Sequence, residues 1–168
     1  KPEEYRSALE ATIAESDQLI RTFNAILMIS RLEAGYSAEA VTKVDLLDAV
    51  RDVVELYDPV AEELRVKLES CTNGSYPVAG NRELIGQALS NIVDNAIKYT
   101  AGGTGSPGRV KVTLARQGSE TVLSVADNGP GIPSDRREDV FLPFYTTHKG
   151  GSGVGLSFAR QVALAHGG

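Results

Sequence analysis

The stretch Asn91-Ile92-Val93-Asp94-Asn95-Ala96-Ile97-Lys98-Tyr99-Thr100 is the part of this chain that indicates its fold and chemistry most clearly. It lies in a predicted helix that Asn81 caps and that runs to about Tyr99. Residues placed about 100° apart form an apolar face (Ile85, Ala88, Leu89, Ile92, Ala96) and a polar face (Gln87, Asn91, Asp94, Asn95, Lys98). A polar helix face is usually only solvated. Carboxamide oxygens can ligate Mg²⁺, however, and a lysine can neutralise phosphate, so this face is a candidate binding site.

The segments before this helix predict the start of a compact domain. Asp45 can cap a helix whose inner side carries Leu46, Leu47, Val50, Val53, Val54 and Tyr57. Residues 65–69 alternate as a strand does, residues 71–75 resemble a turn, and Val78-Ala79 predicts a second short strand. We therefore assign residues 45–168 to the domain and residues 37–44 to a hinge in front of it.

The segments after the helix predict the rest of a two-layer fold. Residues 102–108 are rich in glycine and are expected to form a loop. Alternating residues around Val112 and Ser124 predict two strands that join at Gln117-Gly118. A last helix is expected from about Val154 to His166. The order of elements predicts an α+β fold, a two-layer α/β sandwich in which helices cover one face of a mixed sheet.

Residues 1–36 predict a long helix that precedes the domain. An apolar heptad pattern runs through Leu9, Ile13, Ser16, Ile20, Phe23, Leu27 and Ser30. Leu19 and Ile26 widen this stripe, and Gly35 supplies a stop signal. A solvated linker helix is the simpler alternative, but the width of the stripe favours a helix of an intermolecular bundle.

Two further segments carry residues suited to a nucleotide. The run Asp127-Asn128-Gly129-Pro130-Gly131 places a carboxylate at a strand end, followed by glycines that let backbone approach a flat ligand. Such a run is also a common turn. The alternate glycines of Gly151-Ser152-Gly153-Val154-Gly155-Leu156 lead into a helix, and free amides at a helix N-terminus suit phosphate.

Between these two segments lie apolar anchors, Phe141-Leu142-Pro143-Phe144-Tyr145, followed by the polar residues 146–150. This stretch is either an ordinary loop held by hydrophobic side chains or a lid that closes over a nucleotide.

Composition narrows the class of protein. The net charge of -5 lacks the basic excess with which nucleic-acid binders neutralise phosphates, so we expect no nucleic-acid partner. Cys71 is the single cysteine, which fits a reducing compartment. No stretch approaches the ~20 apolar residues of a membrane span. We expect a cytoplasmic location, with the parent protein able to be an inner-membrane sensor.

Taken together and in this order, these motifs resemble the ATP-binding domain of the superfamily of gyrase-type ATPases, mismatch-repair ATPases and histidine kinases. Residues 91–100 resemble its N box, residues 127–131 its G1 box, residues 141–144 its F box and residues 151–155 its G2 box. The resemblance implies the Bergerat fold, with ATP and Mg²⁺ as cofactors.

The resemblance also implies roles for individual residues. Asn95 would ligate Mg²⁺, Asn91 would lie close to the metal and phosphates, and Asp127 would accept a hydrogen bond from the adenine amino group. We expect Asn91, Asn95 and Lys98 to take part in catalysis. The nucleotide-binding residues would be Asn95, Lys98, Tyr99, Asp127, Gly129, Gly131, Phe144, Gly151, Gly153, Gly155 and Leu156.

The position of Asn91 selects a branch of the superfamily. Hydrolytic members carry a glutamate four residues before the Mg²⁺ asparagine, whereas an amide cannot take a proton from water. The chain thus resembles a protein-histidine kinase, and residues 30–35 (Ser-Arg-Leu-Glu-Ala-Gly) resemble the end of the second helix of the dimerisation hairpin. Its implied partners are its own hairpin, a second copy of the chain and a response regulator.

Two departures and two alternatives accompany this interpretation. The first hairpin helix, with its His-Glu motif, is absent, so this chain alone is not expected to autophosphorylate. The family continues past Gly168, so its last strands are expected to be missing here. An anti-sigma-type serine kinase shares the boxes but needs no dimerisation hairpin. A docking module of a degenerate kinase is the other alternative, although the intact Asn95 and Asp127 argue against it.

Overall fold

The computed structural model describes residues 41–101, 107–147 and 151–168, together with single positions between Tyr5 and Ser30. Its strands are β1 (Thr42–Asp45), β2 (Val66–Cys71), β3 (Pro77–Gly80), β4 (Gly108–Gln117) and β5 (Glu120–Asp127). Its α-helices are α2 (Leu46–Glu63), α3 (Arg82–Ala101) and α4 (Gly155–Ala165), and two 3₁₀ helices, η2 (Ser134–Arg136) and η3 (Asp139–Phe141), lie between β5 and α4.

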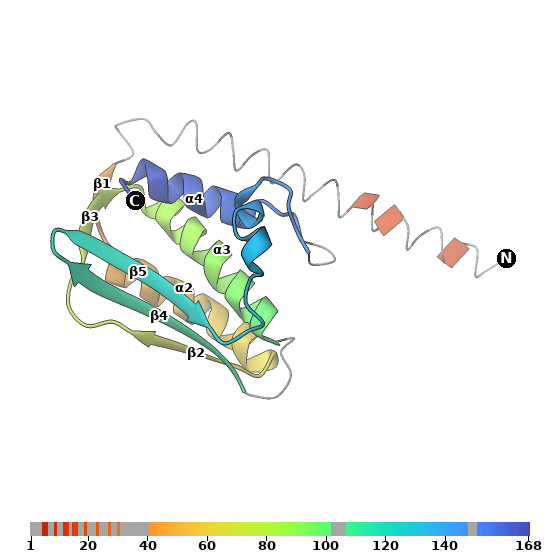
Figure 1. The fold of residues 1–168 in the computed structure, drawn as a ribbon, viewed down its shortest axis with the longest axis horizontal. Coiled ribbons are helices and arrows are strands. Elements are labelled where there is room, and N and C mark those ends of the chain that lie inside the picture. Colours follow the sequence, from red (N-terminus) through yellow and green to blue (C-terminus); the bar gives the residue numbers. More distant parts are fainter. Residues whose placement is uncertain are drawn as a thin grey trace.

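The described part of the chain forms two layers (Figure 1). The main sheet has the order β2-β4-β5, with β2 parallel and β5 antiparallel to β4, and β1 pairs with β3 in a separate antiparallel ribbon. Helices α2 and α3 pack on the main sheet, and α4 packs on α3. This arrangement confirms the α+β sandwich with a mixed sheet.

The core lies between the main sheet and its helices. Along β4, Val110, Val112 and Leu114 are buried, whereas Arg109 and Lys111, on the opposite face of the strand, are exposed. This alternation follows from the two-residue repeat of a strand and shows that helices cover one face of the sheet. Fully burying one such aliphatic side chain stabilises the fold by about 1.5–3 kcal/mol relative to exposure.

Helix α3 is buried on a wider arc than its sequence pattern predicts. Val93 and Ile97 are completely buried against the sheet, although the predicted apolar face did not include them. Leu84 and Ala88 face Phe158 of α4 in a second, smaller cluster. Helix α3 packs against the sheet on one side and against α4 on the other. These two contacts explain why more of its surface is buried than the sequence pattern predicts.

Both predicted helix caps are confirmed. Asp45 Oδ1 accepts a hydrogen bond from the Leu47 backbone N–H at 3.0 Å, at the start of α2. At the start of α3, Asn81 Oδ1 accepts from the backbone N–H groups of Glu83 and Leu84 at 2.9 and 3.1 Å. Each bond satisfies a donor that the first helical turn would otherwise leave unpaired.

The predicted hinge is wrong over its last residues. Residues 42–44 belong to β1, in which Thr42 lies opposite Gly80 and Val44 opposite Val78. Pairing with a strand that follows much later in the sequence produces this ribbon, and a pattern of four residues does not reveal it. Residues 37–40 lie outside the described residues.

The described positions between Tyr5 and Ser30 are all helical. Leu9, Ile13 and Phe23, which belong to the heptad pattern, are exposed. The other heptad position at Ile20 and the predicted helix end at residues 31–36 lie outside the described residues. No helix in the described part of the chain is both long and apolar enough to span a membrane.

Candidate functional site

The polar face of α3 forms the floor of the candidate site. Asn91 and Asn95 are half-buried one helical turn apart, and Lys98 is exposed near the end of the helix. The Lys98 ammonium group forms an ion pair with Asp94 Oδ2 at 2.5 Å. Asn91 Nδ2 is buried without a hydrogen-bond partner among the described residues. A buried donor without a partner is costly, and a ligand oxygen at this place would satisfy it.

The start of α4 lies against Asn91. A Cβ atom at Gly155 would lie 3.4 Å from both Cβ and Cγ of Asn91, which is ordinary contact distance. The first backbone N–H groups of α4 therefore lie next to the polar face of α3. A helix N-terminus beside a lysine and two carboxamides is a favourable place for an anion.

The predicted carboxylate, Asp127, stands at the end of β5. Its Oδ1 accepts a hydrogen bond from the Gly129 backbone N–H at 2.9 Å. A Cβ at Gly129 would lie 3.0 Å from that oxygen and 3.3 Å from the Tyr99 carbonyl oxygen, so the loop passes tightly between β5 and the end of α3. Gly131 adopts a positive φ of 72°, which favours glycine at that turn.

Asn128, to which the sequence motifs assign no role, holds this loop in place. Its Oδ1 accepts from the Arg109 backbone N–H at 2.7 Å, and its Nδ2 donates to the Pro107 carbonyl oxygen at 3.1 Å. The side chain thereby ties the Asp127 loop to the start of β4. Asparagine commonly bonds to backbone in turns, and this tendency is the one signal that could have indicated its role.

Two backbones cross at Phe144 and Gly153. Both residues have a φ of 68°, and a Cβ at Gly153 would lie 2.5 Å from the Phe144 carbonyl carbon. Only glycine fits at this crossing. Close by, the Arg160 guanidinium lies 5.6 Å from the centre of the Phe141 ring, a cation–π contact that joins η3 to α4.

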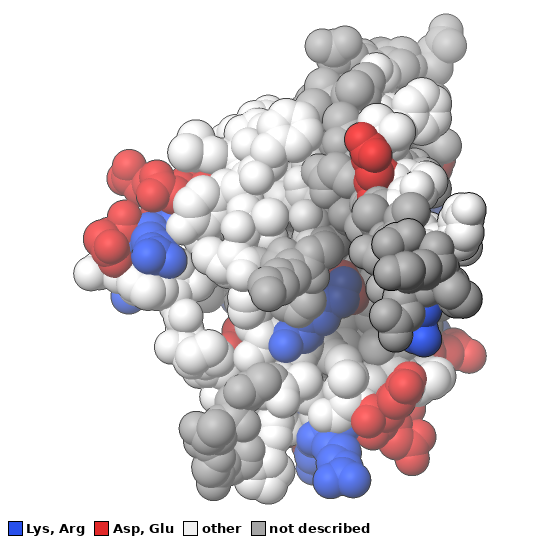
Figure 2. Space-filling view, turned by 90° about the vertical axis from the view of Figure 1, so that its right-hand side faces the viewer, with Lys and Arg blue, Asp and Glu red and all other residues white. Residues whose placement is uncertain are grey.

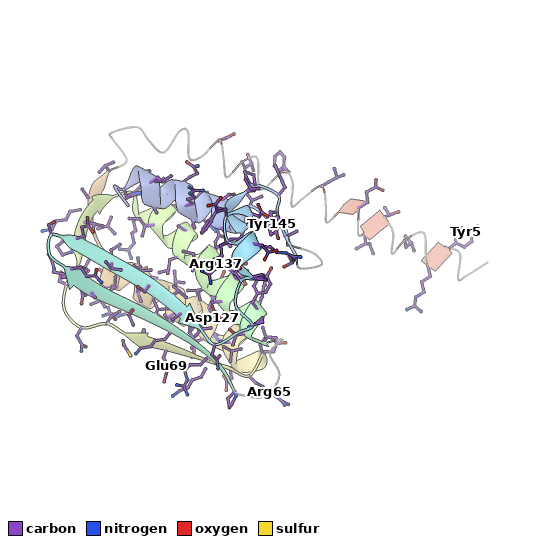
Figure 3. All side chains as sticks on the ribbon, viewed as in Figure 1. Tyr5, Arg65, Glu69, Asp127, Arg137 and Tyr145 are labelled. Atoms are coloured by element: carbon purple, nitrogen blue, oxygen red, sulfur yellow. The ribbon has the colours of Figure 1, made fainter. Side chains whose placement is uncertain are left out.

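The predicted site residues thus gather at one end of the domain. Figure 3 shows Asp127 and Tyr145 at this end, and Arg137 lies between them in this view. Gly151 and Leu156 lie half-buried on either side of Gly153. In Figure 2, which faces this end, basic atoms lie in a recess near the middle of the face. His148, Lys149 and Gly150 of the predicted lid lie outside the described residues.

Two grooves lined by described residues lie elsewhere. One of about 320 Å³ is lined by β1 residues and Arg82, and one of about 400 Å³ lies between α2 and the end of β2. Neither includes a predicted site residue. We favour the end of the domain over these grooves, because the glycines and the buried Asn91 amide that would contact a ligand are found there.

Known proteins resemble this chain in both sequence and fold. Residues 80–168 match the family described as histidine kinase-, DNA gyrase B-, and HSP90-like ATPases. Sensor-like histidine kinase SenX3 of Mycolicibacterium smegmatis (strain ATCC 700084 / mc(2)155) is 29% identical over 173 residues, which cover 99% of this chain and 44% of that protein. The chain spans less than half the length of SenX3 and of three further sensor proteins that it matches.

Two solved structures share the fold. The catalytic domain of histidine kinase ThkA is 31% identical with a TM-score of 0.66, and the match covers 75% of this chain and 81% of that one. Full-length ShkA, crystallised in complex with AMPPNP, is 30% identical with a TM-score of 0.75, and the match covers 98% of this chain and 34% of that one. The chain therefore belongs to the family of histidine kinase-, DNA gyrase B- and HSP90-like ATPases, as a domain of the histidine kinase type.

Proposed function

We propose that this chain binds Mg²⁺-ATP at the end of the domain where α3, the β5 loop and the start of α4 meet. We propose further that it transfers the γ-phosphoryl group to a histidine on a dimerisation hairpin. The observation that carries the proposal is the convergence of three glycine contacts: Gly155 on Asn91, Gly129 on the Tyr99 carbonyl, and Gly153 on Phe144. These contacts bring residues of the four motifs close together, which supports a single site.

Asp127 is the residue that would select adenine. Its Oδ1 already accepts from the Gly129 backbone N–H, which holds the carboxylate at the end of β5. A carboxylate oxygen can accept a hydrogen bond from the exocyclic amine of adenine. Guanine presents a carbonyl oxygen at the same ring position and would leave the carboxylate facing another acceptor. Such an unpaired contact discriminates strongly between bases.

Asn91, Asn95 and Lys98 would form the phosphate and metal end of the site. The residues present fit Mg²⁺-ATP, because the unpartnered Asn91 amide and the carboxamide of Asn95 lie on one face beside the start of α4. Mg²⁺ commonly binds one or two protein oxygens and completes its shell with phosphate oxygens and water. Lys98 is paired with Asp94, and its ammonium group would also interact with the phosphates.

The residues at this site favour phosphoryl transfer over hydrolysis. Asn91 stands where a hydrolase would carry its base, and an amide cannot accept a proton from water. In the transfer, the bond between the γ-phosphorus and its bridging oxygen breaks, a bond to an imidazole nitrogen forms, and ADP leaves. Bound Mg²⁺ supplies charge neutralisation for the phosphates, while the chain positions the nucleotide.

The remaining partners follow from this role. The acceptor histidine would lie on a helical hairpin, and a second copy of the chain would pair through the N-terminal helix, whose described apolar residues are exposed. A response regulator would receive the phosphoryl group from the histidine.

Nucleotide binding can be tested by calorimetric titration with AMPPNP and Mg²⁺. We expect Asp127→Ala and Asn95→Ala each to weaken binding by roughly 10- to 100-fold, because each removes a strong polar contact to the ligand. Chelation of Mg²⁺ should weaken binding by the wild-type chain and have a smaller effect on Asn95→Ala.

Asp58→Ala is the matched control, since Asp58 is an exposed carboxylate on α2. It should bind as the wild type does. Full-strength binding by both Asp127→Ala and Asn95→Ala would contradict the site.

A further inference from the structure

The side chain of Thr147 makes a contact across the proposed site. Its hydroxyl group lies 3.2 Å from the hydroxyl group of Tyr99, within hydrogen-bonding distance, although the two residues are 48 positions apart. Tyr99 lies in the last turn of α3, and Thr147 follows Phe144 after η3. The contact therefore connects the helix that carries Asn91 and Asn95 to the segment that carries Phe144.

Tyr99 stands between two parts of the site. Its backbone carbonyl oxygen is 3.3 Å from the position of a Cβ at Gly129, in the loop that presents Asp127. Its side chain is 39% exposed, so part of it is accessible to a ligand. Tyr99 therefore links the Asp127 loop, which its backbone approaches, to Thr147, which its hydroxyl group contacts.

The segment Phe141–Thr147 is fixed independently of Tyr99. At one end, Phe141 lies under the guanidinium of Arg160 in α4. In the middle, the Phe144 backbone lies against Gly153 at a distance that permits no side chain there. These two contacts fix the segment without any contribution from Tyr99, so Thr147 can hold the Tyr99 ring in place.

We propose that Thr147 is a positioning residue for nucleotide binding, whose hydroxyl holds the Tyr99 ring in the orientation that a bound nucleotide contacts. This inference rests on the proposed Mg²⁺-ATP site. A side chain that is restrained before binding loses less conformational entropy when the ligand arrives. Removal of the Thr147 hydroxyl should therefore weaken binding chiefly by raising the dissociation rate of the nucleotide.

The test compares Thr147→Val, which keeps the shape of the side chain, with Thr147→Ser, which keeps the hydroxyl. In the full chain with Mg²⁺ and AMPPNP, we expect Thr147→Val to raise the Kd about 2- to 10-fold and the dissociation rate by a similar factor. Thr147→Ser should stay close to wild type. Thr121→Val, on β5 and away from the site, is the control and should bind normally.

A double-mutant cycle separates positioning from a general structural effect. Tyr99→Phe, Thr147→Val and the double variant should show nearly the same loss, because either single change breaks the same bond. The midpoint of thermal unfolding should not change in Thr147→Val. Additive losses, or wild-type dissociation rates in Thr147→Val, would overturn the inference.

The same data distinguish this inference from the proposed function. If Asp127→Ala loses binding while Thr147→Val binds as wild type, only the role of Thr147 fails. If the wild-type chain does not bind AMPPNP with Mg²⁺, or if Asp127→Ala and Asn95→Ala both bind fully, the proposed site fails.

Discussion

At the scale of single residues, steric fit explains why glycine is required at certain positions near the proposed site. Gly153 needs its glycine for two reasons, a positive φ and a neighbouring backbone where a side chain would stand. Gly118, in the turn between β4 and β5, shares the positive φ but has open space around it. Comparison of the two separates backbone strain from steric conflict.

We predict that Gly153→Ala impairs the site more than Gly118→Ala does. A residue other than glycine at positive φ costs roughly 1–2 kcal/mol, and Gly118→Ala should lose about that much unfolding free energy. Gly153→Ala must in addition move the backbone of Phe144 away. Its affinity for AMPPNP should fall at least about 10-fold, whereas Gly118→Ala should bind normally in the same titration. Equal affinities of the two variants would show that the crossing is not part of the site.

Residue types alone indicated part of the candidate site. Asp127 and the alternate glycines could be proposed from the sequence, because a carboxylate at a strand end and glycines before a helix have recognisable chemistry. The hydrogen bonds of Asn128 and Thr147 could not be proposed in this way. Their hydrogen bonds join residues that are 21 and 48 positions apart, and no local pattern shows such a pairing.

At the scale of elements, the C-terminal end of α4 is joined to the N-terminal end of α3. The imidazole of His166, just after α4, accepts a hydrogen bond at Nε2 from the Asn81 backbone N–H at 3.1 Å. Its Nδ1 lies 2.7 Å from the Val162 carbonyl oxygen, to which it donates in this tautomer. A Cβ at Gly80 would lie 2.6 Å from this ring. The contact fixes the position of α4 along α3, so that the other end of α4, its N-terminus, lies at Asn91.

The cap of α2 has a pH dependence that can be measured. The hydroxyl of Ser75, followed by the backbone N–H groups of Tyr76 and Leu47, holds the pKa of Asp45 below its usual value. A lowered folded-state pKa adds stability above the unfolded pKa of about 3.9, and this stability is lost as the pH falls through the folded value. We therefore predict that the thermal midpoint of the wild type falls as the pH drops below about 4.

Asp45→Ala should have a lower midpoint at neutral pH and a flatter decline in the acid range. Asp58→Ala, with an exposed carboxylate on the same helix, should keep the wild-type profile. Thermal melts monitored by circular dichroism between about pH 2 and pH 7 provide the comparison. A decline in Asp45→Ala as steep as in the wild type would contradict the role of this cap.

Element boundaries were predictable where local signals mark them. The caps at Asp45 and Asn81 fixed the starts of α2 and α3, since both side chains bond to the first helical turn. The short strand β1 was missed, because its partner β3 lies more than thirty residues away and its hydrogen bonds come from tertiary pairing. The burial of Val93 was missed for a related reason, since it depends on α3 meeting the sheet.

At the scale of the whole molecule, the fold brings segments from three regions of the chain to one end of a sandwich. Helix α3 contributes carboxamides, β5 ends in a carboxylate, and α4 begins next to Asn91. Helix α3 packs on the sheet that includes β5, and α4 packs on α3 (Figure 1). The order of motifs made this class of fold predictable, whereas their mutual contacts required the structure.

Phosphoryl transfer to a separately supplied two-helix hairpin from a related sensor kinase tests the central claim most directly. The chain is mixed with this hairpin, Mg²⁺ and ATP labelled at the γ-phosphate, and acid-labile label on the acceptor histidine is counted. Wild-type chain should label the histidine, while chelation of Mg²⁺ or the Asp127→Ala substitution should reduce the rate by roughly 10-fold or more. Absence of label on the histidine, with a hairpin that its own catalytic domain does phosphorylate, would contradict the account.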